Sequence, residues 1–259
     1  MCIQIPFTTY AENIPQAIAA LDAGTRLKQQ KRIFIKPNLV NAAPPPVTTP
    51  VECCAALIDT LRHYTEAQIT IAEGTGTAKQ ETPAVFEALG YTDLARDKAV
   101  DLLDLNTAQL LELRNPECSV FQHMYLPQAL MQGFLLSVPV LKAHSLAQMT
   151  GSLKNMMGLA PPQYYGQKGG WKKARFHAQM HSAIVDVNTY RSADLTLMDA
   201  SRGLATYHLG GPECEPPLQT ILAGWDPLEV DRAGAELLGL NWKDIPHLTQ
   251  PIIPSSAGQ

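Results

Sequence analysis

Residues 133–158 read GFLLSVPVLKAHSLAQMTGSLKNMMG, and this stretch predicts both the fold class and the place of a site. From Phe134 to Leu141 it is almost continuously apolar, as expected of a central parallel strand that is covered on both faces. The strand delivers Lys142 and His144 to its carboxyl end, and a glycine-containing turn follows. In open α/β sheets that edge faces the ligand crevice. The stretch therefore predicts an anion site.

The charge around this stretch is segregated. No Asp or Glu occurs from Cys118 to Val185, although the chain of 259 residues holds 24 acidic side chains. The same window carries six Lys and Arg, so a net charge of +6 lies within a remainder of −10, and the total is −4. The sequence thus indicates the sign of a ligand, but it does not name the reaction.

Outside this stretch, predicted strands and helices alternate along the chain. Apolar runs at 33–35, 68–72, 194–199 and 218–225 are typical of strands. Amphipathic or capped segments predict helices at 14–27, 51–63, 81–89, 177–190 and 226–238. We therefore expect an α/β fold with three layers and a mostly parallel sheet joined by crossover helices.

The expected domain organisation is simple. Residues 1–250 are predicted to form a single α/β domain, and residues 251–259 a flexible tail. Two short strands at 100–105 and 118–126 leave room for a small inserted β and loop subdomain.

Polar residues at the ends of two predicted strands are candidates for the same site. Lys36 and Asn38 flank a proline after the first strand, and Glu73 follows the strand 68–72. A carboxylate there can serve as a base, a metal ligand or the partner of a lysine. The alternative for these residues is a solvated lysine beside turn-forming side chains.

The turn after the central strand resembles a phosphate cradle without matching a known one. Thr150 and Gly151 are expected to break the predicted helical segment 145–158, and Ser152 to cap a short helix with Lys154 and Asn155 in its first turn. Free amides at such a start favour anions. The P-loop spacing is missing, and Lys79 replaces the third glycine of a dinucleotide fingerprint after Glu73.

Residues 159–176 predict a long basic loop, which we interpret as a lid or a partner surface. It contains Tyr164, Tyr165 and Trp171 together with four cationic residues. In the helix that follows, His177 is a candidate for substrate binding. The spacing of His177 and His181 is also compatible with a metal, but no acidic third ligand lies nearby and no metal is predicted.

The five cysteines are scattered and include no C-x-x-C pair, so neither a disulfide framework nor a cysteine metal site is expected. The N-terminus lacks the pattern of a signal peptide, and no apolar run reaches 18 residues. These features predict a cytoplasmic protein without membrane association; the sequence does not predict an oligomeric state.

The chain resembles the domain of unknown function 362 family. Motifs spread in order along the sequence carry the resemblance, namely Lys36-Pro37-Asn38, Glu73-Gly74-Thr75-Gly76, Lys142-Ala143-His144, residues 150–158, His177, Asp186, Gly210-Gly211-Pro212 and Asp226. The family has no settled activity to transfer. Many members carry a ferredoxin-like module with two cysteine clusters. This chain lacks those cysteines, so the resemblance implies no iron–sulfur cluster here, and the cofactor stays open.

These features together favour an enzyme that acts on a small anion, a carboxylate or a phosphate. Lys154, the amides of Gly151 and Ser152 and the lid cations would hold the anion, while Lys142 or His144 transfers protons and Glu73 orients one of them. Isomerase, racemase or lyase chemistry suits this set.

Three alternatives remain open. The protein could work with an external redox partner. Its aromatic and basic lid could bind single-stranded nucleic acid, although the net charge opposes this. The lysines could also be structural, each paired with a distant acid.

Overall fold

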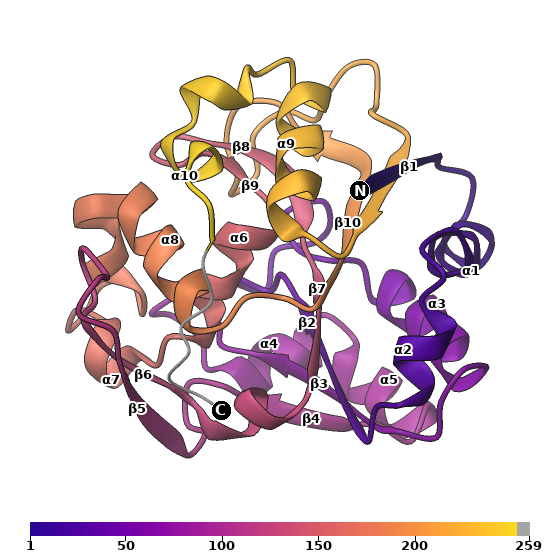
Figure 1. Ribbon diagram of the computed structural model, residues 1–259, viewed down its shortest axis with the longest axis horizontal. Helices are drawn as coiled ribbons and strands as arrows, with labels where there is room; N and C mark the ends of the chain where they lie inside the picture. The colour runs from indigo at the N-terminus through magenta and orange to yellow at the C-terminus, as the bar shows by residue number, and fades with distance from the viewer. Residues whose placement is uncertain (253–259) are drawn as a thin grey trace.

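Residues 1–252 are described by the structure, a computed structural model, and a twisted sheet runs through the middle of the molecule (Figure 1). Within the described residues the sheet contains nine strands. Their bounds are β1 Cys2–Pro6, β2 Arg32–Pro37, β3 Gln68–Glu73, β4 Asp101–Asp104, β7 Phe134–Val138, β8 Val140–His144, β9 Gln148–Thr150, β10 Leu195–Leu204 and β11 Thr220–Gly224.

The strand order is β1-β11-β10-β7-β2-β3-β4. The strands from β10 to β4 are parallel to their neighbours, and β11 is antiparallel to both β10 and β1. β8 continues β7 beyond Pro139, runs parallel to β10 and forms a hairpin with β9. The predicted α/β fold with a mostly parallel sheet is therefore confirmed.

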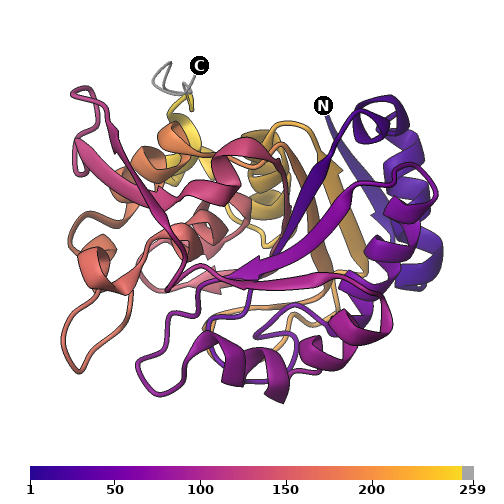
Figure 2. The same cartoon turned by 90° about the horizontal axis from the view of Figure 1, so that it is seen from below.

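Two groups of helices cover the two faces of the sheet (Figures 1 and 2). Successive side chains of β2 point to opposite faces of the sheet, so Ile33 and Ile35 pack in one buried cluster and Phe34 packs in the other. The first group is α1 Tyr10–Ala20, α2 Gly24–Lys28, α3 Val51–Arg62, α4 Thr82–Ala88 and α5 Tyr91–Asp97. The second is α6 Ser152–Asn155, α8 Met180–Tyr190, α9 Pro227–Leu237 and α10 Pro246–Thr249, with the 3-10 turns η2 Met156–Leu159, η3 Ala174–Gln179 and η4 Trp242–Asp244.

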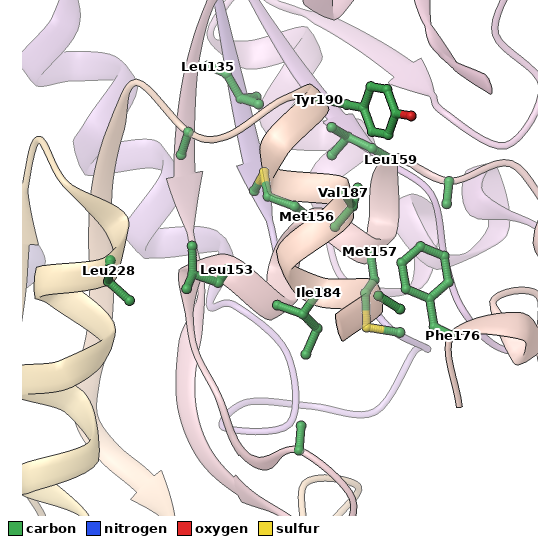
Figure 3. Close-up of a cluster of buried hydrophobic side chains, with 14 of the residues drawn as sticks. Leu135, Leu153, Met156, Met157, Leu159, Phe176, Ile184, Val187, Tyr190 and Leu228 are labelled. Carbon is green, nitrogen blue, oxygen red and sulfur yellow. The ribbon is translucent and has the colours of Figure 1, made fainter. Parts of the chain in front are cut away.

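The buried cluster on the α8 side of the sheet fixes the segment that follows β9. Leu153, Met156 and Met157 pack with Ile184 and Val187 of α8 (Figure 3). All five side chains are buried. The short α6 turn is thus held by side chains that pack against α8. Lys154, on the other side of this turn, lines the cavity at the carboxyl edge of the sheet.

Several predicted elements differ in detail from the structure. The predicted strand 134–141 is two strands, since Pro139 interrupts it between β7 and β8. The predicted helical segment 145–158 begins instead with a turn at 145–147 and β9, because residues 148–150 pair with β8. The predicted helix 14–27 is broken at Asp22, whose φ is 48°.

Other differences concern strands and loops. β1 was missed. Of the two short strands predicted to form a small inserted subdomain, 100–105 is β4 of the main sheet. The small sheet pairs β6 His123–Pro127, within the other predicted region, with β5 Leu110–Arg114, which was not predicted, and it lies next to the 3-10 turn η1 Gln128–Gln132. The predicted lid contains the helical turn α7 Pro162–Tyr165 and the start of η3. Residues 253–259 of the predicted tail lie outside the described residues. No helix in residues 1–252 has the length and apolarity to cross a membrane.

Candidate functional site

A cavity of about 310 Å³ lies at the carboxyl ends of β2, β3 and β8. From β2 the sheet extends through β3 and β4 on one side and through β7 and β10 on the other, so the strand order reverses direction between β2 and β7. Open α/β sheets bind ligands at such points. Nine of the eleven site residues expected from the sequence line this cavity, namely Lys36, Asn38, Glu73, Lys142, His144, Thr150, Lys154, Asn155 and His177.

Lys36 and Glu73 form a buried ion pair in the wall of the cavity. The Nζ of Lys36 lies 2.8 Å from Glu73 Oε1, and it also donates to Asn155 Oδ1 at 3.1 Å and to the Pro37 carbonyl at 3.2 Å. Glu73 Oε2 accepts the amide proton of Leu39 at 2.8 Å. Burial lowers the pKa of Lys36 and the neighbouring carboxylate opposes this effect. The three protons of Lys36 are satisfied, so this lysine has little capacity left for a ligand.

Lys142 has a different environment, because it has no carboxylate partner in the described chain. Its Nζ donates to Asn38 Oδ1 and, at 2.5 Å, to the Val47 carbonyl. Burial, reinforced by the charge of Lys154, lowers the pKa of Lys142 to about 7. A neutral amine has two N–H groups and one lone pair. Both N–H groups of neutral Lys142 therefore donate to neutral acceptors, and the lone pair of Nζ is left for a group in the cavity.

Lys154 is the uncompensated cation of the site. It lines the cavity from α6, and its Nζ forms no hydrogen bond or ion pair with another residue in 1–252. Burial lowers the pKa of Lys154 to about 8. A desolvated charge without a partner is costly, and such sites are typical of ligand-binding positions.

We expect that replacing Lys154 with methionine stabilises the unliganded protein at neutral pH. The folded pKa is below the unfolded value of 10.5, so the cost of the charge is present below pH 8 and disappears as the pH rises to 10.5. After a discount for partial exposure the gain is about 1–2 kcal/mol, or roughly 2–8 °C. Melting curves from pH 7 to 10.5 measure it. A Lys154→Met protein that melts below the native protein would contradict the assignment.

His144 is held as a neutral donor. Its Nδ1 accepts the amide protons of Leu146 and Ala147, both at 3.1 Å. The proton of the neutral ring is therefore on Nε2. Burial, with Lys154 as the next cause, lowers the pKa of His144 to about 2. The expected acid–base role near neutral pH does not agree with this environment.

Glu73 has one of its predicted roles, that of the partner of a lysine, but the lysine is Lys36. Its carboxylate binds Lys36 and backbone amides, and among the described residues neither Lys142 nor His144 forms a hydrogen bond with it. The two lysines at the ends of β2 and β8 thus differ: Glu73 forms an ion pair with the first, and within residues 1–252 no acid forms an ion pair with the second.

Two polar atoms of the cavity wall are buried without a hydrogen-bond partner within residues 1–252, Thr150 Oγ1 and His208 Nδ1. Such atoms are rare and point to a missing partner. The ring of His208 stacks on that of His144, with centroids 3.9 Å apart. His208 was not among the predicted site residues, although its position two residues before the Gly210-Gly211-Pro212 motif was a signal in the sequence.

The amides expected to bind an anion are already occupied. Asp231 of α9 is fully buried, and its carboxylate accepts the amide protons of Ser152 at 2.6 Å and Leu153 at 2.9 Å. A Cβ at Gly151 would overlap the same carboxylate, and neither Gly151 nor Ser152 lines the cavity. Their predicted role as substrate-binding residues is therefore corrected: this helix start binds an acid of the protein itself.

The lid cations also contact the protein. Lys172 pairs with Glu81 at 2.8 Å, and Arg175 donates to the Tyr164 carbonyl. Lys173 reaches the cavity wall, but its Nζ donates to Asn106 Oδ1 at 2.5 Å and to the Ala160 carbonyl. Burial lowers the pKa of Lys173 to about 7. These residues anchor the lid segment rather than offer free charge.

The two histidines at metal-like spacing separate in the structure. His177 lines the cavity, whereas the Nδ1 of His181 lies 2.8 Å from the Nδ1 of His247 in α10. Nowhere in residues 1–252 do three His, Cys, Asp or Glu side chains gather in a way that would hold a metal ion.

Comparison with known proteins gives the family. The family model described as a domain of unknown function, DUF362, matches residues 33–236, which include the whole set of cavity lysines. The chain belongs to the DUF362 family. No curated protein sequence matches it.

Two solved structures share the fold of this DUF362 protein. The lactate racemase apoprotein from Thermoanaerobacterium thermosaccharolyticum is 14% identical with a TM-score of 0.52, over 77% of this chain and 51% of that one. A protein from Thermotoga maritima is 11% identical with a TM-score of 0.54, over 93% of this chain and 60% of that one. The chain thus spans about half to three-fifths of the structures it matches.

Proposed function

We propose that this DUF362 protein is an enzyme that binds a small anionic substrate in the cavity and moves a proton on it, as isomerases and racemases do. One observation carries the proposal. Lys154, a lysine without a partner in the described chain, shares a cavity with Lys142, whose hydrogen-bond acceptors are neutral and whose pKa is lowered to about 7. Abstraction of a proton next to a carboxylate requires two groups in one cavity, a cation that binds the carboxylate and a base whose pKa is near neutral pH.

The residues take separate roles in this proposal. Lys154, as the protonated lysine, binds the anionic group. Lys142 accepts the proton through the lone pair of its Nζ, because its two N–H groups donate to Asn38 and Val47. His144 donates from Nε2 to the substrate oxygen on which charge develops, because the two amide protons at Nδ1 keep the proton of the neutral ring on Nε2. Thr150 Oγ1 offers a further hydroxyl to the substrate.

The fold likeness to a lactate racemase apoprotein supports an isomerase-like reaction, but at 14% identity it transfers neither substrate nor residues. The proposal therefore rests on the cavity. Single-stranded nucleic acid binding receives less support, because Lys172 and Lys173 of the lid are tied to protein acceptors.

A thermal-shift screen of carboxylates and phosphates tests the anion site. An anion at 100 times its dissociation constant adds about 2.7 kcal/mol, which corresponds to roughly 5–10 °C for a chain of this size. We expect this shift in the native protein and in Lys168→Met, whose exposed lid lysine is outside the cavity, and its loss in Lys154→Met. An equal shift in all three proteins would refute the proposed anion site.

A further inference from the structure

The mouth of the cavity is apolar, unlike its floor. Six large hydrophobic residues are exposed in the described chain, and three of these line this one cavity: Leu146 at 52%, Trp171 at 40% and Tyr207 at 47% exposure. Single exposed apolar residues need no explanation, but their concentration around one opening does.

The apolar residues reach the opening from three separate segments of the chain. Trp171 belongs to the lid segment, which is attached beyond β3 through the bond from the Lys172 amide to the Gly76 carbonyl at 2.8 Å. Leu146 lies in the β8–β9 hairpin. Tyr207 packs edge-on against His208 at 5.1 Å, and His208 stacks on His144. A row of three rings thus leads from the mouth to the donor at the floor.

At the floor, by contrast, one lysine is left to bind a negatively charged group. Glu73 compensates Lys36, and the Nζ groups of Lys142 and Lys173 are bound by neutral oxygens. Among the described residues that line the cavity, Lys154 is the remaining cation, and the hydroxyl of Thr150 belongs to the same lining. The cavity volume of about 310 Å³ is at the lower end of the range of about 300–1,000 Å³ for small-molecule sites. This volume is larger than a two- or three-carbon acid needs.

From this division we infer that the substrate is a monocarboxylate with an apolar body, aromatic or aliphatic, whose carboxylate binds Lys154 at the floor and whose body lies between Trp171 and Tyr207 at the mouth. The inference rests on the proposed function and narrows its substrate class. The apolar body leaves water on entering the mouth, and flat rings stack favourably on the aromatic side chains.

Titration calorimetry with four probes, propionate, 3-phenylpropionate, the uncharged 3-phenylpropanol and inorganic phosphate, tests this inference. We expect 3-phenylpropionate to bind at least tenfold more tightly than propionate or phosphate, and 3-phenylpropanol to bind at least tenfold more weakly than 3-phenylpropionate. Trp171→Ala and Tyr207→Ala should each reduce the advantage of 3-phenylpropionate over propionate at least threefold. Leu111→Ala, which removes an exposed apolar side chain of β5 outside the cavity, should leave it unchanged.

The outcomes separate the two proposals. If propionate or phosphate binds as tightly as 3-phenylpropionate and Lys154→Met abolishes the binding, the anion site stands and the apolar substrate class is overturned. If Trp171→Ala and Tyr207→Ala change the ratio no more than Leu111→Ala, the mouth is not the binding surface and the inference also fails. If no anion binds, or Lys154→Met binds all four probes like the native protein, the proposed function falls with it.

Discussion

Replacing Lys142 with methionine should lower proton exchange by a factor of about 10²–10⁴, the usual contribution of a positioned base. The reaction to follow is exchange of the proton next to the carboxylate with D₂O, by NMR, on the carboxylate that binds most tightly. Methionine keeps the unbranched stem of the side chain as far as the ε-carbon and removes the nitrogen, so the change in the shape of the cavity is small. Lys168→Met is the matched control and should exchange at the native rate.

The pH profile distinguishes a catalytic Lys142 from a structural one. A base must be unprotonated, so the native rate should rise as the pH increases through about 7. Lys154 must be protonated to bind the anion, so the rate should fall above about pH 8. The two lysines interact, and the limbs of this narrow bell therefore report apparent pKa values of the pair. A rate independent of pH between 6 and 9, with normal exchange in Lys142→Met, would contradict the assignment.

Replacing Asp231 with alanine should destabilise the protein by about 2–6 kcal/mol. The change leaves the amides of Ser152 and Leu153 buried without acceptors, at about 1–3 kcal/mol each. Asp231→Asn keeps one acceptor oxygen and should lose less. Urea unfolding of the variants measures both losses.

Asp226→Ala provides a second acid-to-alanine variant in the same region. It removes the N-cap of α9, whose side chain accepts the Leu228 amide proton at 2.9 Å, and should cost about 0.5–2 kcal/mol. An Asp231→Ala variant no less stable than Asp226→Ala would show that the α6 amides do not depend on the buried carboxylate.

The same residue has a predictable pH dependence. Burial raises the pKa of Asp231 to about 7, above the value of 3.8 for an exposed aspartate. The folded state therefore binds more protons between pH 4 and 7, so this group's contribution to stability falls as the pH rises through that window. Asp231→Ala should lack this part of the pH dependence.

The sequence predicted the layers and the edge of the sheet at which the cavity lies. Apolar runs ending in Lys36, Glu73 and Lys142 are sufficient for this prediction, because parallel strands bring their carboxyl ends to one edge. The family assignment also followed from motifs along the chain, and the family match over residues 33–236 confirms it.

What the sequence could not supply was the partner of each polar group. Asp231 follows Ser152 by 79 positions, and Glu73 follows Lys36 by 37, so nothing local indicates that the first acid occupies the helix start or that the second compensates Lys36 rather than Lys142. His208 joins the site through a stacking contact with His144. Spacing along the chain determines secondary structure because its hydrogen bonds and side-chain periods are local. The charge left over in a cavity depends on which distant groups pair there, and only the tertiary structure decides that.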